Sequence, residues 1–533
     1  MRRVNRIGFA AIILVLQLLS TAPLEARAPV GLQALYRKHV STLASEKMGG
    51  RKSATPGAVL ARKYLIDQFG AIGLKPAFKD SYRQQFPMIL EMQPGDQKLS
   101  GTRNDKQTTQ LRHGRDFKAL ASSRSSSFSG QAVFIGYAIS NGERKFNNFG
   151  QWDKGSLKGK VAVAFRYEPH HRTGQSKWTK RRGGWTRSAS LLRKAYLAAH
   201  YGASALLVVN PPAHSKASLT TYKGISPLKT DIPVLNVSTD AFKRMLGGVS
   251  DDPDKEIALL LSSANAGTKP LGDIPGLKIS GKVSFKPKMG ESCNIAAKLE
   301  GRGDLAGEVI IVGAHWDHIG RVRGAKRGSP RSYNPGADDN ASGAAGILIL
   351  AKQLAKRDKI NPPKHRRTII LTFFGAEEAA LIGSTYLAKN LKDFGLKRSQ
   401  IVAMVNLDMI GRMRNNTLYA WSVDLAGQWD RMIRRSARGS GLNLKVSGPG
   451  MGLSDHRSFY YLKMPVVSLT TGLHPDIHRP SDTIDKINFA GAIKVLNVTE
   501  KLIGALSVRP EAVPYEGPGA EASKPKPQGA KRD

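Results

Sequence analysis

The sequence predicts an α/β fold with a mostly parallel (mixed) central sheet and helices on both faces. Runs of apolar and β-branched residues predict four buried strands, at 308–314, 367–374, 401–407 and 464–469. Between the first two, residues 341–356 carry apolar side chains at helical spacing. Buried strands that alternate with helices are typical of parallel sheets covered on both faces. Ligands of such sheets bind beyond the carboxyl ends of the strands, so residues at those ends are the first candidates for a site.

The amino terminus has the pattern of a signal peptide over residues 1–28. Arg2, Arg3 and Arg6 form a basic start, residues 7–22 are mostly apolar, and Ala26-Arg27-Ala28 fits a cleavage site. We therefore expect an exported protein that is periplasmic, cell-surface or secreted. An uncleaved membrane anchor is the alternative, although the apolar run is short for a span.

The rest of the chain of 533 residues is expected to hold a discontinuous main domain with an insertion. The main domain would comprise 29–125 and 255–507, starting with a helical region that includes a helix at 58–72. The insert at 126–254 has patterns for short strands and for one helix. Residues 508–533 are rich in Pro, Gly, Ala, Glu and Lys, which predicts a disordered tail. The strands of the insert are expected at 133–137, 160–165, 205–210 and 233–237, and its helix at 191–200.

Charge and cysteine content narrow the classes of function. The 82 Lys and Arg residues exceed the 41 Asp and Glu residues by 41, but they are spread along nearly the whole chain. No helix-turn-helix, zinc-finger or RNA-binding signature accompanies them, so we expect no specific nucleic-acid binding. Electrostatic association with an anionic cell envelope remains open. Cys293 is the only cysteine, which excludes an intramolecular disulfide.

Histidine and acidic residues gather at the predicted strand ends. His315 and Asp317 follow the first strand, and a nearby carboxylate can hold a ligand imidazole in the right tautomer. Asp338-Asp339 precedes the helix at 341–356; one aspartate would serve as a helix cap, but a metal pair needs a bridging carboxylate. Together, the histidine and the carboxylates of these two motifs indicate a metal site.

The later strand ends add further carboxylates. Glu377-Glu378 lies between apolar segments, where adjacent like charges are unfavourable without a cation nearby. Asp408 sits in an apolar run and needs either a partner or access to solvent. His474 and His478 compete for the last ligand position; we favour His478 because it directly precedes the turn Arg-Pro-Ser-Asp-Thr.

In this order the motifs resemble those of peptidase family M28, the co-catalytic dizinc exopeptidases. The segment Met48-Gly-Gly-Arg51 looks like the family's amino-terminal region, and the insert resembles a protease-associated (PA) domain. The resemblance implies two Zn²⁺ ions, with mixed imidazole and carboxylate ligands that suit zinc. It further implies ligand roles for His315 and Asp408 at one ion, Glu378 and His478 at the other, Asp339 at both, Glu377 as general base and Asp317 as the partner of His315.

The expected activity is that of a secreted metal-dependent aminopeptidase acting on peptide or protein N-termini. A carboxypeptidase or amidohydrolase of the same fold is an alternative, and a non-catalytic envelope-binding protein is another. His318, Asp338, His474 and Asp482 are neighbours of the motifs without an assigned role.

Overall fold

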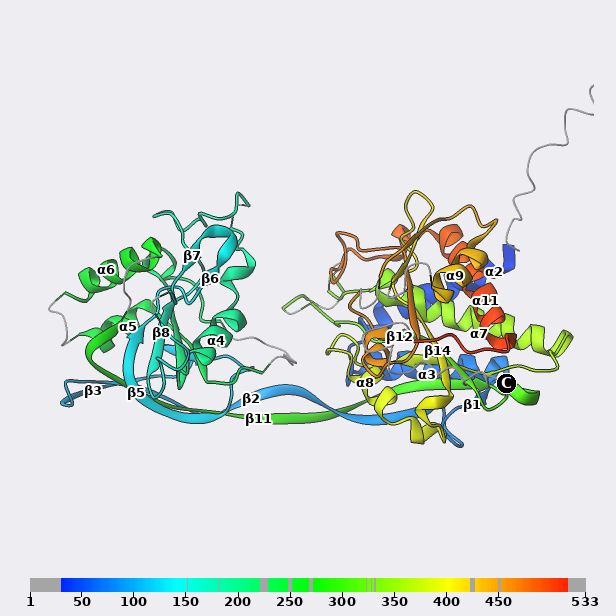
Figure 1. The fold of residues 1–533 in the computed structure, drawn as a ribbon, viewed down its shortest axis with the longest axis horizontal. Coiled ribbons are helices and arrows are strands. Elements are labelled where there is room, and N and C mark those ends of the chain that lie inside the picture. Colours follow the sequence, from blue (N-terminus) through cyan, green and yellow to red (C-terminus); the bar gives the residue numbers. More distant parts are fainter. Residues whose placement is uncertain are drawn as a thin grey trace, which may run out of the picture. The chain divides into compact units, whose positions relative to one another are not determined.

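The computed structural model describes residues 30–515, apart from gaps at 151, 182, 221–228, 248–251, 268–271, 323, 327, 330–331, 422–426 and 449–451. The predicted signal peptide lies outside the described residues. The chain divides into two compact units (Figure 1). Unit 1 comprises Met1–Phe86 and Ser292–Asp533, and unit 2 comprises Pro87–Glu291.

Four parallel strands form the centre of unit 1. Their order across the sheet is β17 (Val466–Thr470), β14 (Ile401–Leu407), β12 (Val309–His315) and β13 (Thr368–Phe374), with parallel pairing between neighbours. All four predicted strands are confirmed to within two residues at each end. The sheet is mixed because its flanking strands run antiparallel, which confirms the predicted class. These are β15 (Thr417–Trp421), which also pairs with β16 (Asn443–Val446), and the last residues of β11 (Asp273–Leu299), which pairs with β13 and β1 (Lys75–Pro76).

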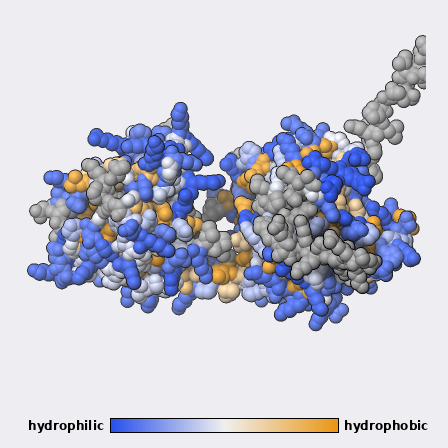
Figure 2. Space-filling view, viewed as in Figure 1, coloured by the Kyte–Doolittle hydropathy of each residue, from blue (hydrophilic) through white to orange (hydrophobic). Residues whose placement is uncertain are grey.

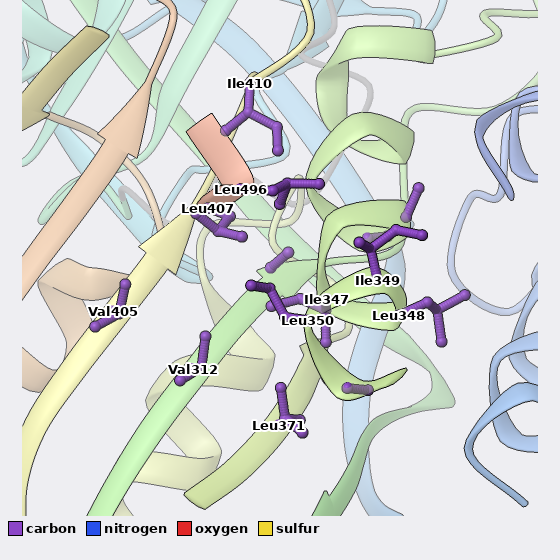
Figure 3. Packing of buried hydrophobic residues seen from close by; sticks show 14 of the residues in the cluster. Val312, Ile347, Leu348, Ile349, Leu350, Leu371, Val405, Leu407, Ile410 and Leu496 are labelled. Carbon is purple, nitrogen blue, oxygen red and sulfur yellow. The ribbon is translucent and has the colours of Figure 1, made fainter. Parts of the chain in front are cut away.

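Both faces of this sheet are buried, which explains its unbroken apolar strands. Successive β12 side chains point to opposite faces, so Ile310 and Val312 join one core while Val309 and Ile311 join another. Helix α7 (Gly343–Ile360) packs on the first face, where Leu350 of the helix and Val312 of β12 belong to the same buried cluster (Figure 3). The first core also includes residues from α2 (Val30–Leu43), α3 (Pro56–Ile72), α9 (Gln428–Ala437) and α11 (Phe489–Val508), whereas α8 (Ile382–Lys389) and α10 (His456–Tyr460) contribute to the second.

Unit 2 contains its own parallel strands, in the order β5 (Ser126–Phe134), β8 (Val161–Phe165), β9 (Ala205–Val209) and β10 (Val234–Val237). Strand β4 (Phe117–Ala119) closes one edge in antiparallel fashion. The helices are α4 (Leu191–His200), which was predicted, α5 (Thr239–Leu246) and α6 (Pro253–Ala266). This unit starts earlier and ends later than the predicted insert at 126–254.

Two long strands account for the wider boundaries. Strand β2 (Arg83–Arg103) and strand β11 extend through positions 87 and 291, where the contacts divide the chain. Sequence patterns do not predict β2, because Pro87, Pro94 and Gly95 are disfavoured in strands. Its pairing with β11 and with β3 (Gln107–Leu111) outweighs that local preference.

The packed part of unit 1 continues past the predicted boundary at 508. Arg367 is almost completely buried, and its Nη1 donates hydrogen bonds to the carbonyls of Leu506 and Arg509. Val513 is buried as well. A buried guanidinium needs acceptors, and the chain after α11 provides one of them.

The visible faces of the two units are mainly hydrophilic, with apolar residues scattered among the polar ones (Figure 2). Within the described residues, none of the helices combines the length and apolar character that a transmembrane span requires.

The close contact between α8 and the end of β13 can be tested at Gly383. A Cβ at this position would lie 2.1 Å from the Gly375 carbonyl oxygen and 2.5 Å from Asn294 Oδ1. We expect Gly383→Ala to lower the free energy of unfolding by about 1–3 kcal/mol, since neither neighbour is a flexible side-chain end. Gly70→Ala is the control: a Cβ there meets nothing within 4 Å, so the helix should gain about 0.5–1 kcal/mol. Denaturant unfolding of both variants measures this, and equal stabilities would contradict the proposed contact.

Candidate metal centre

The candidate site lies at the carboxyl ends of three neighbouring parallel strands. His315 is the last residue of β12, Glu377 and Glu378 follow β13 after a two-residue turn, and Asp408 directly follows β14. Because parallel neighbours end at the same edge, side chains far apart in sequence meet there. Asp339 comes from the irregular segment Ala337–Ser342, just before α7.

One group of potential ligands contains His315, Glu377 and Asp408, whose ligand atoms all lie within 4.8 Å of one another. His315 Nε2 is 3.4 Å from Asp408 Oδ1 and 3.3 Å from Asp339 Oδ1. These contacts bring together the residues that the sequence analysis grouped at one ion, with Glu377 beside them.

The second group contains His318, Asp339 and Glu378. His478 joins it, with its Nε2 3.2 Å from Asp339 Oδ2 and 3.0 Å from Glu378 Oε2. The two oxygens of Asp339 thus face different groups: Oδ1 faces His315, and Oδ2 faces His478. This is the arrangement that a bridging carboxylate requires.

His318 had no assigned role, yet it lies inside the cluster. Its side chain is completely buried and its Nδ1 is 2.6 Å from Glu378 Oε1. The only sequence signal was its place three residues after His315, within the same motif.

The structure separates the two competing histidines. His478 contacts Asp339 and Glu378, whereas His474 Nε2 lies 3.2 Å from Asp338 Oδ2. The Asp338 carboxylate also accepts a hydrogen bond from the Gly411 amide at 2.6 Å. His474 and Asp338 therefore form a buried pair behind the cluster.

The contacts of Asp317 differ from the expected carboxylate–imidazole pair. Its backbone carbonyl oxygen lies 3.2 Å from His315 Nδ1, while its carboxylate accepts the Glu377 backbone N–H at 3.0 Å. The Asp317 backbone carbonyl thus orients the His315 imidazole, and the Asp317 carboxylate holds the backbone N–H of Glu377. Spacing alone could not distinguish these roles, because the turn after β12 decides which group faces the ring.

Asp482, another residue without an assigned role, holds the segment that carries Asp339. Its Oδ2 accepts the backbone N–H groups of Asp338 and Asp339, both at 3.1 Å. Arg412 Nη1 lies 3.7 Å from its other oxygen.

Arg51 connects the loops around the site. It is completely buried, and its guanidinium donates to the carbonyl oxygens of Trp316, Pro335, Gly336 and Leu43 at 2.7–3.0 Å. Burial lowers its pKa to about 10, while the Asp339 and Asp317 carboxylates act in the opposite direction. Arg51 thus remains charged at neutral pH and offsets part of the acidic cluster.

The carboxyl groups titrate unusually because they are buried together. Burial raises the pKa of Asp317 to about 7, and burial together with Asp455 and Asp408 raises the pKa of Glu377 well above its ordinary value. Burial would also raise the pKa of Asp339, but contacts with His315 and His478 hold it well below the usual range. The histidine imidazoles therefore offset only part of the negative charge of these carboxylates.

The donor set fits a divalent metal. Asp408 Oδ1 and His318 Nε2 are buried and have no hydrogen-bond partner, which is costly unless something else satisfies them. Imidazole and carboxylate donors without thiolate suit zinc. The cluster thus provides buried lone pairs that can coordinate a cation. It also carries negative charge that its own cationic residues do not balance.

The raised pKa of Asp317 predicts a pH-dependent stability difference. In chelator-treated protein the folded state holds this proton up to about pH 7, whereas the unfolded chain loses it near its ordinary pKa of about 3.9. Above pH 4 the unfolded state therefore binds fewer protons than the folded state, so the stability contribution of Asp317 falls as pH rises to about 7.

We therefore expect Asp317→Asn to gain stability relative to the wild type between pH 4 and 7, by on the order of a few kcal/mol. Denaturant unfolding at several pH values measures this. Asp80→Asn, at an exposed carboxylate, should show no such trend. A difference at Asp317 that stays constant with pH would contradict the raised pKa.

Several known proteins are similar to this chain in sequence or fold. Residues 294–503 match the model of peptidase family M28. A probable leucine aminopeptidase of Arthroderma otae is 30% identical over 239 residues, which is 44% of this chain and 61% of that protein. Leucine aminopeptidase 1 of Trichophyton rubrum is 29% identical over 208 residues, or 37% and 53% of the two chains. This chain thus spans little more than half the length of these relatives.

Two solved structures share the fold over most of both chains. An aminopeptidase from Aneurinibacillus sp. strain AM-1 has a TM-score of 0.52 at 20% identity and covers 91% of this chain and 96% of its own. BSAP, a zinc aminopeptidase from Bacillus subtilis, has a TM-score of 0.50 at 17% identity and covers 90% and 96%. Such coverage exceeds unit 1 alone, so the likeness in fold extends into unit 2. Residues 294–503 thus match peptidase family M28, and the fold of these solved aminopeptidases extends over most of the chain.

Proposed function

We propose that this protein is a zinc-dependent aminopeptidase that removes residues from the N-termini of peptides. The observation that carries the proposal is the pair of histidine–carboxylate groups joined by Asp339, with a further, partly buried glutamate, Glu377, beside them. The family match and the aminopeptidase names of the relatives support the same activity.

In the proposed centre His315 and Asp408 would hold one zinc ion, Glu378 and His478 would hold the other, and Asp339 would serve both. His318 would orient the Glu378 carboxylate through the 2.6 Å contact between its Nδ1 and Oε1. Arg51 and Asp482 keep the backbone of the bridging segment in place. When bound, zinc at such a site polarises the substrate carbonyl and makes water more acidic.

Glu377 is proposed as the general base. Its backbone N–H donates a hydrogen bond to Asp317, and its partly buried side chain lies beside His315 and Asp408. Without metal its pKa is raised well above the ordinary value. Nearby cations favour the charged form, which is the form that accepts a proton. Glu377 would take a proton from the attacking water and pass it to the leaving amine.

We further propose export through residues 1–28 and a PA-like role for unit 2. Both rest on sequence patterns: the signal-like amino terminus and the resemblance of the insert. The positive charge of the chain supports electrostatic association with an anionic envelope.

Glu377→Gln tests the proposed base. This change keeps the shape of the side chain but removes its ability to accept the proton, so kcat should fall by about 10²–10⁴-fold with zinc content unchanged. Aminoacyl reporter substrates, with N-blocked versions as controls, measure turnover. Glu300→Gln, at a partly exposed residue outside the site, should retain activity. Full activity of Glu377→Gln would reject the assignment, and cleavage of N-blocked substrates would count against an aminopeptidase.

Asp339→Ala tests the bridging role. Removing the carboxylate that faces both histidine groups should lower the zinc content well below two ions per chain, because each ion loses a ligand. Elemental analysis after dialysis against dilute zinc measures the stoichiometry. Asp393→Ala provides a control at a carboxylate that pairs with Gln84 instead. Two retained ions in Asp339→Ala would exclude a bridging role.

A further inference from the structure

We propose that unit 2 contains a separate binding pocket for a peptide's carboxyl-terminal residue with an aromatic or large apolar side chain. The pocket has a volume of about 270 Å³ and lies within the range 166–220, so unit 2 provides it alone. It contains none of the residues of the metal centre and therefore does not depend on the proposed function. Its walls are formed by Arg166, Tyr167, Trp185, Thr186, Ala189, Ser190, Leu191 and Thr220.

The pocket lies where parallel sheets commonly bind ligands. Arg166 and Tyr167 directly follow β8, and Thr220 belongs to the connection that follows β9. Strands β8, β9 and β10 are parallel, so their carboxyl ends share one edge. Crevices beyond such edges are the usual ligand sites of α/β sheets.

One wall is aromatic. The rings of Tyr167 and Trp185 stack with centroids 4.3 Å apart and planes 19° apart, and His214 packs 4.7 Å from Tyr167. Tyr167 and Trp185 are both partly exposed, so part of their surface remains available. Such a wall favours a planar or bulky apolar group in the ligand.

The charge on the pocket wall is positive. Arg166 is the only charged side chain among the lining residues. Its Nη1 donates to the Ser218 carbonyl at 3.0 Å and to Asn210 Oδ1 at 3.3 Å, and its guanidinium carbon lies 4.7 Å from the centre of the Tyr167 ring. These contacts fix the position of the guanidinium plane, and arginine in a fixed plane suits carboxylate recognition.

A buried carboxylate joins the two segments that carry Tyr167 and Trp185. Glu168 is completely buried and accepts hydrogen bonds from the Ser176 hydroxyl at 2.5 Å, from the Thr186 amide at 3.1 Å and from the Thr186 hydroxyl. Tyr167, just before it, has a φ of +73°, a strained conformation for a bulky residue. Such strain persists where the surroundings impose it, often at ligand sites.

These features together define the ligand. It carries a negative group for Arg166, an apolar or aromatic group for the Tyr167–Trp185 wall, and amide groups that the hydroxyls of Ser190 and Thr220 can bind. The volume fits about one amino-acid residue. A free amino acid would also bring an ammonium group, which no acidic lining residue offsets. A peptide carboxyl terminus has the required chemistry without that charge.

Calorimetric titration of the full-length, zinc-loaded protein tests the proposal with three probes. N-acetylphenylalanine should bind with one site per chain. Free phenylalanine should bind more weakly, because of its ammonium group, and N-acetylphenylalaninamide at least about tenfold more weakly, because it lacks the carboxylate. Equal binding of the acid and the amide, or no binding of any probe, would overturn the proposal.

Two pocket variants test whether N-acetylphenylalanine binds in unit 2. Arg166→Gln should weaken N-acetylphenylalanine binding at least about tenfold, whereas Arg193→Gln, at an exposed arginine on α4 outside the pocket, should leave it unchanged. Trp185→Leu is a second variant that removes the aromatic wall without changing the charge, and it should weaken binding as well. Circular dichroism of each variant checks the fold. Wild-type affinity in both pocket variants would reject the site.

The metal centre must be excluded as the source of binding. Asp339→Ala should bind N-acetylphenylalanine with wild-type affinity, and Arg166→Gln should hydrolyse aminoacyl reporters that lack a free carboxylate at the wild-type rate. Loss of binding in Asp339→Ala would assign the ligand to the metal centre instead. These results do not depend on whether the metal centre is an aminopeptidase, because binding is measured directly.

Discussion

The metal centre depends on the balance of charge among acidic side chains that are buried at one edge of a sheet. Asp317, Asp339, Glu377 and Glu378 lie close together, and burial penalises each negative charge. Histidines and Arg51 supply part of the compensating charge, and bound cations would supply the rest. An acidic cluster of this kind is poorly suited to stability alone, which is why it points to a metal.

This cluster is held in position mainly by side chains that form hydrogen bonds with the backbone. Arg51 binds the carbonyls of three segments, Asp482 binds the amides of the bridging segment, and Asp317 binds the amide of the proposed base. The ligand side chains are thereby fixed through their main chains. Preorganisation of this kind lowers the reorganisation that metal and substrate binding require.

The pocket of unit 2 is also ordered by hydrogen bonds to a buried side chain, but the charge on its lining is opposite to that of the metal centre. This pocket also lies beyond the carboxyl ends of parallel strands, and a buried carboxylate, Glu168, orders its wall. The lining carries an arginine where the metal centre carries carboxylates. The two sites therefore suit different groups: cations in unit 1, and a ligand carboxylate in unit 2.

The sequence by itself determined the strands, the helix α7 and the chemistry at the strand ends, because these depend on local patterns of burial and on short motifs. His315, Asp339, Glu377, Glu378 and Asp408 could be selected in this way, and His478 could be favoured over His474 from its turn. Tertiary structure alone decided the rest. His318 enters the cluster through a contact 60 positions away, Arg51 binds carbonyls more than 260 positions away, and the carboxylate of Asp317 faces an amide instead of an imidazole. Strands β2 and β11 likewise form through pairing that their proline and glycine content does not indicate. Contacts between distant segments follow from packing of the whole sheet, and no local pattern encodes them.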